Sequence, residues 1–185
     1  LHRAVCAQHV ELVLTAHPTT ITRRTLAHKQ QRIAEALATQ DRYGIDVITN
    51  SWGTSVSTYD PNSPVNKASY EAYRRGMVVA FAAGNDGPDE DTINPYALVP
   101  WVISVGSGLK TGGLSDFSSQ GVPGDFYKHV DLVAPGSSIR STRAIGTALP
   151  ATGPVLDTTN PLYTTYYASM SGTSMATPHV AGGVG

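Results

Sequence analysis

The run Met77-Val78-Val79-Ala80-Phe81-Ala82 decides the fold class, because an unbroken apolar run of this length is typical of a strand covered on both faces. Upstream, residues 65–73 show helical spacing of apolar residues, and Gly76 is suited to end that helix. The expected helix face consists of Val65, Ala68, Ala72 and Tyr73. Residues 45–48 predict a preceding strand, so the order is strand, helix, strand.

Two further apolar segments, Trp101–Val105 and Val130–Val133, continue this alternation, and glycine or proline follows each. The pattern predicts an α/β fold with a doubly wound, mostly parallel sheet and flanking helices. A helical N-terminal segment is expected to precede it. The Pro-, Gly- and Thr-rich stretch from Ser141 to Pro161 predicts a long surface loop.

Composition is that of a folded globular protein, with 41% hydrophobic and 15% charged residues. The net charge of −1 gives no reason to expect nucleic acid or an anionic membrane as a partner. No apolar run approaches the roughly 20 residues needed to span a bilayer, and the N-terminus lacks a signal-peptide pattern. Cys6 is the single cysteine, which excludes an internal disulfide.

The amino-acid composition changes abruptly near Tyr43. Every glycine and every Phe, Tyr and Trp lies at or after this residue. Residues 1–42 carry six basic against three acidic side chains, whereas the remainder carries seven against eleven. We therefore expect two pieces, a helical segment over 1–42 and a glycine-rich fold over 43–185.

The N-terminal piece has a motif of its own, in which Val10–Thr19 leads through a turn at Pro18 into Ile21–Lys29. This stretch resembles a segment of phosphoenolpyruvate carboxylase and departs from it at Thr20. The resemblance implies a catalytic role for His17 and anion-binding roles for nearby arginines. Without the rest of that enzyme, a solvated basic helix is the favoured interpretation, with Leu26, Ile33 and Leu37 on one face and Arg23, Arg24, Lys29 and Arg32 largely elsewhere.

The second informative motif is Gly172-Thr173-Ser174-Met175-Ala176-Thr177-Pro178-His179-Val180-Ala181-Gly182. It places a serine between a small-residue turn and the start of a helix, where exposure and the helix dipole favour a nucleophile. These residues resemble the serine motif of the subtilisin-like serine proteases (subtilases, peptidase S8), and Ser174 matches the nucleophile. The resemblance covers residues 43–185 and implies an incomplete subtilisin-like sheet, cut short in the serine helix.

A second catalytic candidate follows the buried strand. Asn85 stands between Gly84 and Gly87, at the carboxyl end of a parallel strand, where ligand sites form. In the resembling family, the asparagine matching Asn85 donates its side-chain N–H to the oxyanion, and the Ser174 N–H is the second donor. The alternative for Asn85 is a turn residue.

Two segments match the substrate-lining strands of that family: Ser51-Trp52-Gly53 and Ala82-Ala83-Gly84. Small residues leave room for a substrate side chain, and free backbone groups can pair with an extended peptide. The alternative is that the glycines merely end strands. Residues 131–136 match a further family hallmark, whose implied role is structural.

The base for Ser174 is the missing part. His179 lies in the same predicted helix and is expected to be structural, and His129 is expected at the surface. Subtilases order their triad as Asp, His, Ser, so the aspartate and histidine motifs belong upstream of Tyr43. Neither is found there.

The leading hypothesis is therefore a subtilisin-like serine endopeptidase fragment, fused or misjoined to a carboxylase segment and nearly inactive as it stands. Peptide or protein is the expected partner, with no nucleic acid and no membrane, and the sequence indicates no cofactor and no metal site. Family resemblance implies a secreted parent. The alternatives are a non-catalytic peptide-binding protein and, last, a phosphoenolpyruvate carboxylase fragment.

Overall fold

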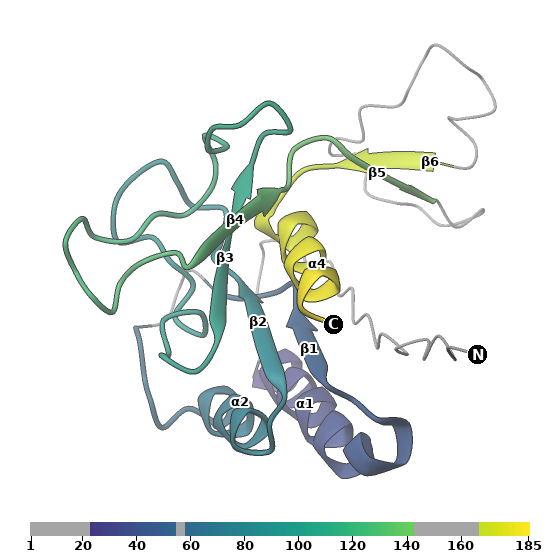
Figure 1. Ribbon diagram of the computed structural model, residues 1–185. Coiled ribbons are helices and arrows are strands. Elements are labelled where there is room, and N and C mark those ends of the chain that lie inside the picture. The colour runs from purple at the N-terminus through teal and green to yellow at the C-terminus, as the bar shows by residue number, and fades with distance from the viewer. Residues whose placement is uncertain (1–22, 55–57, 143–166) are drawn as a thin grey trace.

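The computed structural model describes residues 23–54, 58–142 and 167–185, with the backbone alone for residues 23–27 (Figure 1). Its main sheet is parallel throughout, in the order β1-β2-β3-β4. These strands are β1 Val47–Asn50, β2 Val78–Ala82, β3 Ile103–Gly108 and β4 Leu132–Pro135. The four strands predicted from the sequence are confirmed, and each begins one or two residues later than predicted.

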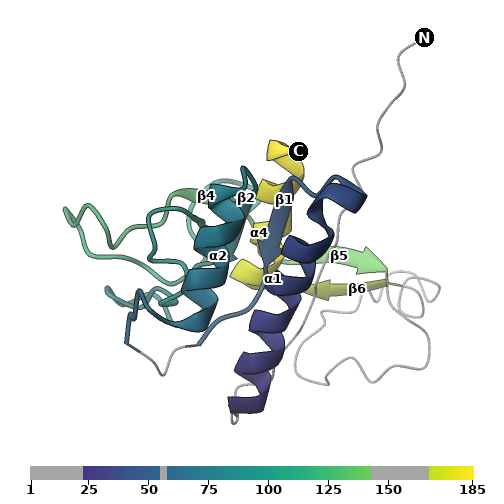
Figure 2. The same ribbon diagram turned by 90° about the horizontal axis from the view of Figure 1, so that it is seen from below.

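Helices cover both faces of the sheet. Figures 1 and 2 show α1 (Arg23–Tyr43) and α2 (Pro64–Arg74) side by side, and α4 (Thr173–Val184) lies against all four strands. Successive residues of β2 point to opposite faces of the sheet. Phe81 packs on the side of α1 and α2, and Ala80 packs on the side of α4. The α/β architecture with flanking helices is confirmed.

The α1/α2 face carries the larger core. Trp52 packs edge-on against Phe81, with ring centroids 5.1 Å apart, and against Tyr96 at 5.6 Å. Ile33 of α1 and Ala72 of α2 are also buried in this cluster. The C-terminal half of α1 is thus part of the packing, and the boundary predicted near residue 42 stays a prediction.

Several expectations are corrected by the packing. Tyr73 is expected on the buried face of α2 but is 54% exposed, because the part of that face that packs on the core consists of Val65, Ala68 and Ala72. Lys29 was expected in solvent but is 1% exposed, because its ammonium lies 4.7 Å from the centroid of the Trp52 ring. Cys6, His17, the predicted turn and cap at residues 18–20 and the Leu26 side chain lie outside the described residues.

A small antiparallel sheet follows β4. It consists of β5 (Ile139–Thr142) and β6 (Tyr167–Met170), so Ser141 belongs to a strand and not to the loop predicted to begin there. The rest of that predicted loop lies outside the described residues.

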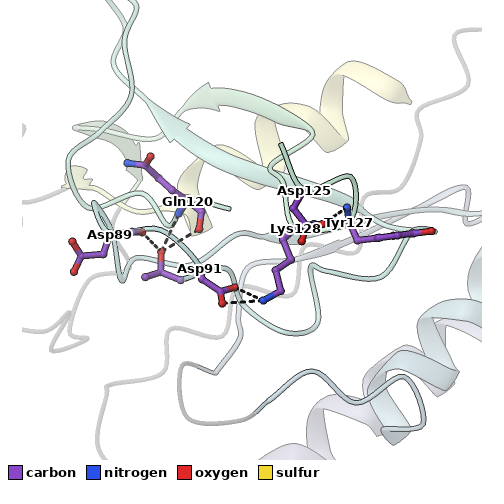
Figure 3. Close-up of polar contacts among 7 residues, drawn as sticks. Asp89, Asp91, Gln120, Asp125, Tyr127 and Lys128 are labelled. Carbon is purple, nitrogen blue, oxygen red and sulfur yellow. Dashed lines mark hydrogen bonds and ion pairs between the residues drawn. The ribbon is translucent and has the colours of Figure 1, made fainter. Parts of the chain in front are cut away.

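The loop that follows β2 and the loop between β3 and β4 are joined by polar contacts (Figure 3). Lys128 Nζ forms an ion pair with both carboxylate oxygens of Asp91, at 2.8 and 2.9 Å. The Asp125 carboxylate accepts the backbone N–H groups of Tyr127 and Lys128, and these bonds hold its pKa below the ordinary value. The contacts tie residues 86–92 to residues 118–129.

Candidate functional site

Ser174 lies at the second position of α4, and its hydroxyl is half-buried. Its Oγ donates to the Ser51 carbonyl at 3.0 Å, and the Ser51 hydroxyl donates to the Ser174 carbonyl at 2.8 Å. Pro178 explains the second bond, because proline has no N–H with which to satisfy the Ser174 carbonyl within the helix. The reciprocal pair fixes the serine against the end of β1.

Thr173, which precedes Ser174, holds Asn85 beside the serine. The Thr173 N–H and the Thr173 hydroxyl both donate to Asn85 Oδ1, at 2.9 and 3.0 Å. Thr173 Oγ1 also accepts the Gly84 N–H at 3.2 Å. Because Oδ1 is taken twice, the Nδ2 group of this exposed side chain is the end of the amide that can donate to a ligand.

The two predicted oxyanion donors both lie near Gly172. A Cβ built at Gly172 would lie 3.5 Å from Asn85 Nδ2 and 3.6 Å from the Ser174 nitrogen. The Ser174 N–H is among the first groups of α4, which have no acceptor within their own helix. Met175 Sδ lies 3.7 Å from the same position, and Gly172 itself places no side chain between these groups.

Gly136 allows β4 to approach this turn. Its carbonyl accepts the Gly172 N–H at 2.8 Å, and a Cβ at Gly136 would lie 2.3 Å from Ser107 Oγ and 2.7 Å from the Gly172 carbonyl. The structural role expected for the 131–136 segment agrees with this packing.

The two binding segments, residues 51–53 and 82–84, follow β1 and β2 and lie close together. Trp52 does not line a ligand site with its side chain, because the indole is buried in the core. Most backbone groups that the sequence suggested were free are paired. The carbonyls of Trp52, Ala82 and Ala83 accept from Asn94, and the Ala83 N–H donates to Val105.

Gly53 differs from the other residues of these segments, each of which has at least one paired backbone group. Among the described residues, neither its N–H nor its C=O has a hydrogen-bond partner. An extended peptide could pair with both groups in the manner of an added strand.

The described histidines do not reach Ser174. His179 Nδ1 bonds its own helix at the Met175 carbonyl, 2.8 Å away, and His129 Nε2 pairs with Asp131 at 3.0 Å. His28 is exposed on α1. The structural reading of His179 and the surface reading of His129 fit these positions, and the described part of the chain supplies no imidazole base for Ser174.

Within the described ranges, no group of three or more His, Cys, Asp or Glu side chains is arranged to hold a metal ion. None of the described helices has the length and apolar character needed to cross a membrane.

The sequence pattern of the subtilase family (peptidase S8) matches residues 19–185. The chain belongs to the subtilase family. This match and the fold confirm the resemblance based on the serine motif. The carboxylase resemblance of residues 1–42 stays a prediction, and the subtilase match already includes residues 19–42.

The chain is similar in sequence to curated proteases of two fungi. Subtilisin-like protease 1 of Arthroderma otae is 40% identical over 121 residues, which are 65% of this chain and 20% of that protein. The protein of the same name from Trichophyton verrucosum is 38% identical over the same share of this chain and 24% of its own length. The chain therefore spans about a fifth to a quarter of these curated relatives.

Solved structures give the same picture for the fold. Sphericase superposes with a TM-score of 0.63 at 28% identity, over 83% of this chain and 46% of that chain. The prenylagaramide maturation protease PagA superposes with a TM-score of 0.64 at 25% identity, over 92% of this chain and 50% of that chain. The subtilase fold present here is thus about half of a solved relative.

Three residues that organise the site are not predicted by the sequence pattern. Thr173 links Asn85 to Gly84, Ser119 Oγ accepts the Asp86 N–H, and Asn94 bonds both binding segments. Thr173 stands inside the serine motif and could have been considered there. The other two lie in loops whose contacts no local pattern announces.

Proposed function

We propose that this chain is part of a serine endopeptidase that hydrolyses peptide bonds by acyl transfer through Ser174. The observation that carries the proposal is the proximity of Asn85 Nδ2 and the Ser174 N–H, which lie 3.5 and 3.6 Å from a Cβ built at Gly172. Two N–H donors close together beside a serine hydroxyl are suited to stabilise the oxyanion of a tetrahedral intermediate.

The backbone of the two binding segments would hold the substrate. Gly53 offers an unpaired N–H and C=O, and Ser51, Trp52, Ala82, Ala83 and Gly84 form its surroundings. The substrate is therefore a peptide or an extended segment of a protein. Family membership also suggests that the parent enzyme acts outside the cell.

Activity of the chain as given requires a base that its described residues do not supply. The Ser174 hydroxyl donates to the Ser51 carbonyl, which is too weak a base to remove the proton. We expect only very slow turnover by this chain alone, because its sequence shows neither the aspartate motif nor the histidine motif of the triad.

A fluorophosphonate reagent that labels activated serines tests the proposal. Modification of Ser174 should be slow in buffer and should accelerate when imidazole is added as an external base. Asn85→Asp keeps the acceptor for Thr173 but removes the Nδ2 donor. Because loss of such a donor costs roughly 10²–10³-fold in subtilisin, we expect Asn85→Asp to reduce the imidazole-assisted rate comparably.

Ser174→Ala is the blank, and Ser171→Ala, whose hydroxyl contacts the Ser138 N–H, is the matched serine control. Rapid stoichiometric labelling without imidazole would show that a base is present. No labelling of Ser174 even with imidazole would refute its role as nucleophile.

One observation favours a second candidate, a non-catalytic peptide-binding protein. All three described histidines lie away from Ser174, while the backbone groups of Gly53 remain unpaired. This candidate expects saturable peptide binding that Ser174→Ala does not change, together with no phosphonate labelling under any condition.

A further inference from the structure

Asn94 connects the two binding segments with one buried amide. Its Nδ2 group donates to the Trp52 carbonyl at 3.2 Å and to the Ala82 carbonyl at 3.0 Å. Its backbone N–H donates to the Ala83 carbonyl at 2.7 Å, and the Tyr96 N–H donates to its Oδ1 at 3.2 Å. The residue is 4% exposed, so these bonds are shielded from water.

The position of the bridge explains why an amide is needed there. Pairing between β1 and β2 ends at Asn50 and Phe81, so the carbonyls that follow cannot both be satisfied by the strand ladder. An NH₂ group can donate to two carbonyls at once, which a carboxylate or a hydroxyl cannot do. Asn94 therefore extends the connection between the strands into the binding segments.

Gly53 packs directly on this amide. A Cβ at residue 53 would lie 2.3 Å from Asn94 Nδ2, so the side chain of Asn94 occupies the space beside the glycine backbone. Gly84 is held in a similar way on the other segment, where a Cβ would lie 2.6 Å from Ser119 Oγ. The free N–H and C=O of Gly53 thus have their place set by a residue that does not face the serine.

We propose that Asn94 is a positioning residue for substrate binding, which fixes Gly53 relative to residues 82–84 so that an extended peptide can pair with its backbone. This inference rests on the proposed function, because it assigns Asn94 a part in the binding of the same peptide. Asn94 acts through Gly53 and the two carbonyls, and it takes no part in acyl transfer.

Two phosphonates separate this role from the chemistry at Ser174. One is a small alkyl fluorophosphonate, and the other carries the same reactive group at the end of a tetrapeptide. The ratio of their labelling rates measures what the peptide backbone contributes to binding. We expect Asn94→Ser to lower this ratio by about 10-fold or more, since misplaced binding groups lose much of the benefit of orientation.

Asn66→Ser is the matched control. Asn66 is also a buried asparagine, and its Nδ2 donates to the Asp60 carbonyl at 2.7 Å, but it lies on α2. The control should lose stability and leave the labelling ratio unchanged. An unchanged ratio in folded Asn94→Ser, or an equal fall in Asn66→Ser, would overturn the proposal.

Amide hydrogen exchange provides a measurement that does not depend on Ser174. In Asn94→Ser, but not in Asn66→Ser, the N–H groups of Ala83 and Gly84 should exchange faster. If neither phosphonate labels Ser174, the proposed function fails. The exchange result still decides the positioning role in that case. If the N–H groups of Ala83 and Gly84 exchange at the same rate in Asn94→Ser as in Asn66→Ser, the positioning role is overturned.

Discussion

The two faces of the sheet are packed by opposite means. On the α1/α2 face, large rings fill the space, with Trp52, Phe81 and Tyr96 in mutual contact. Under α4 the buried apolar residues are Ala80, Val105, Ala134 and Ala176.

Paired and unpaired polar groups occur on both faces, since Thr49 Oγ1, beside Ala80 on the α4 face, is buried without a hydrogen-bond partner among the described residues. Under α4, Ser107 shares hydrogen bonds with Ser115, and the Thr177 hydroxyl donates to the Thr173 carbonyl. On the α1/α2 face, Lys29 Nζ and Trp52 Nε1 are buried without a hydrogen-bond partner among the described residues. Bulk burial stabilises the fold on one face, whereas close approach and paired hydroxyls position the serine helix on the other.

The largest effect is expected from removing bulk on the α1/α2 face. Phe81→Ala leaves a cavity between Trp52 and Tyr96 and should lower the free energy of unfolding by about 3–5 kcal/mol. Urea unfolding followed by circular dichroism measures this. Phe126→Ala is the control, since that ring is 81% exposed and its loss should change stability by less than about 0.5 kcal/mol. Equal effects of the two changes would contradict the assignment of the main core.

On the α4 face, adding bulk should be the damaging change. Ala176 is fully buried against the sheet, so Ala176→Leu should cost about 1–3 kcal/mol by overpacking. Gly182→Ala adds a methyl group to the same helix where nothing lies within 4 Å, and it should stabilise by about 0.5–1 kcal/mol. Thermal melting of both variants gives the comparison. A tolerated Ala176→Leu would mean that α4 is not closely packed.

The parts that the sequence predicted well are those with a local signal. The strands carry apolar runs bounded by glycine or proline. The roles of Ser174 and Asn85, which stay predictions, also rest on local motifs. Asn94 could not be predicted, because its amide meets carbonyls 42 and 12 residues away and only the fold brings them together. The exposed Tyr73 shows that helical spacing fixes a direction on a helix but not the width of the face that is covered.

Lys29 was misplaced for the same reason, since Trp52, the ring that covers it, belongs to a distant segment. The burial of Lys29 can be tested by substitution. Lys29→Met keeps much of the shape and removes a buried charge that has no hydrogen-bond partner among the described residues. The contact with the Trp52 ring offsets part of the desolvation cost, so we expect a gain of only about 1 kcal/mol at neutral pH.

The pH dependence of that gain has a definite sign. Burial lowers the pKa of Lys29 in the folded chain, so the unfolded chain binds more protons between the lowered pKa and the ordinary value of about 10.4. Stability of the unmodified protein therefore gains a contribution as pH rises through this interval, and Lys29→Met lacks it. Urea midpoints at neutral pH and near pH 10 should show the advantage of the variant shrinking. A variant that is less stable than the parent at neutral pH would show that the contact between Lys29 and the Trp52 ring outweighs the desolvation cost of the ammonium. The buried cation would then stabilise the α1/α2 face.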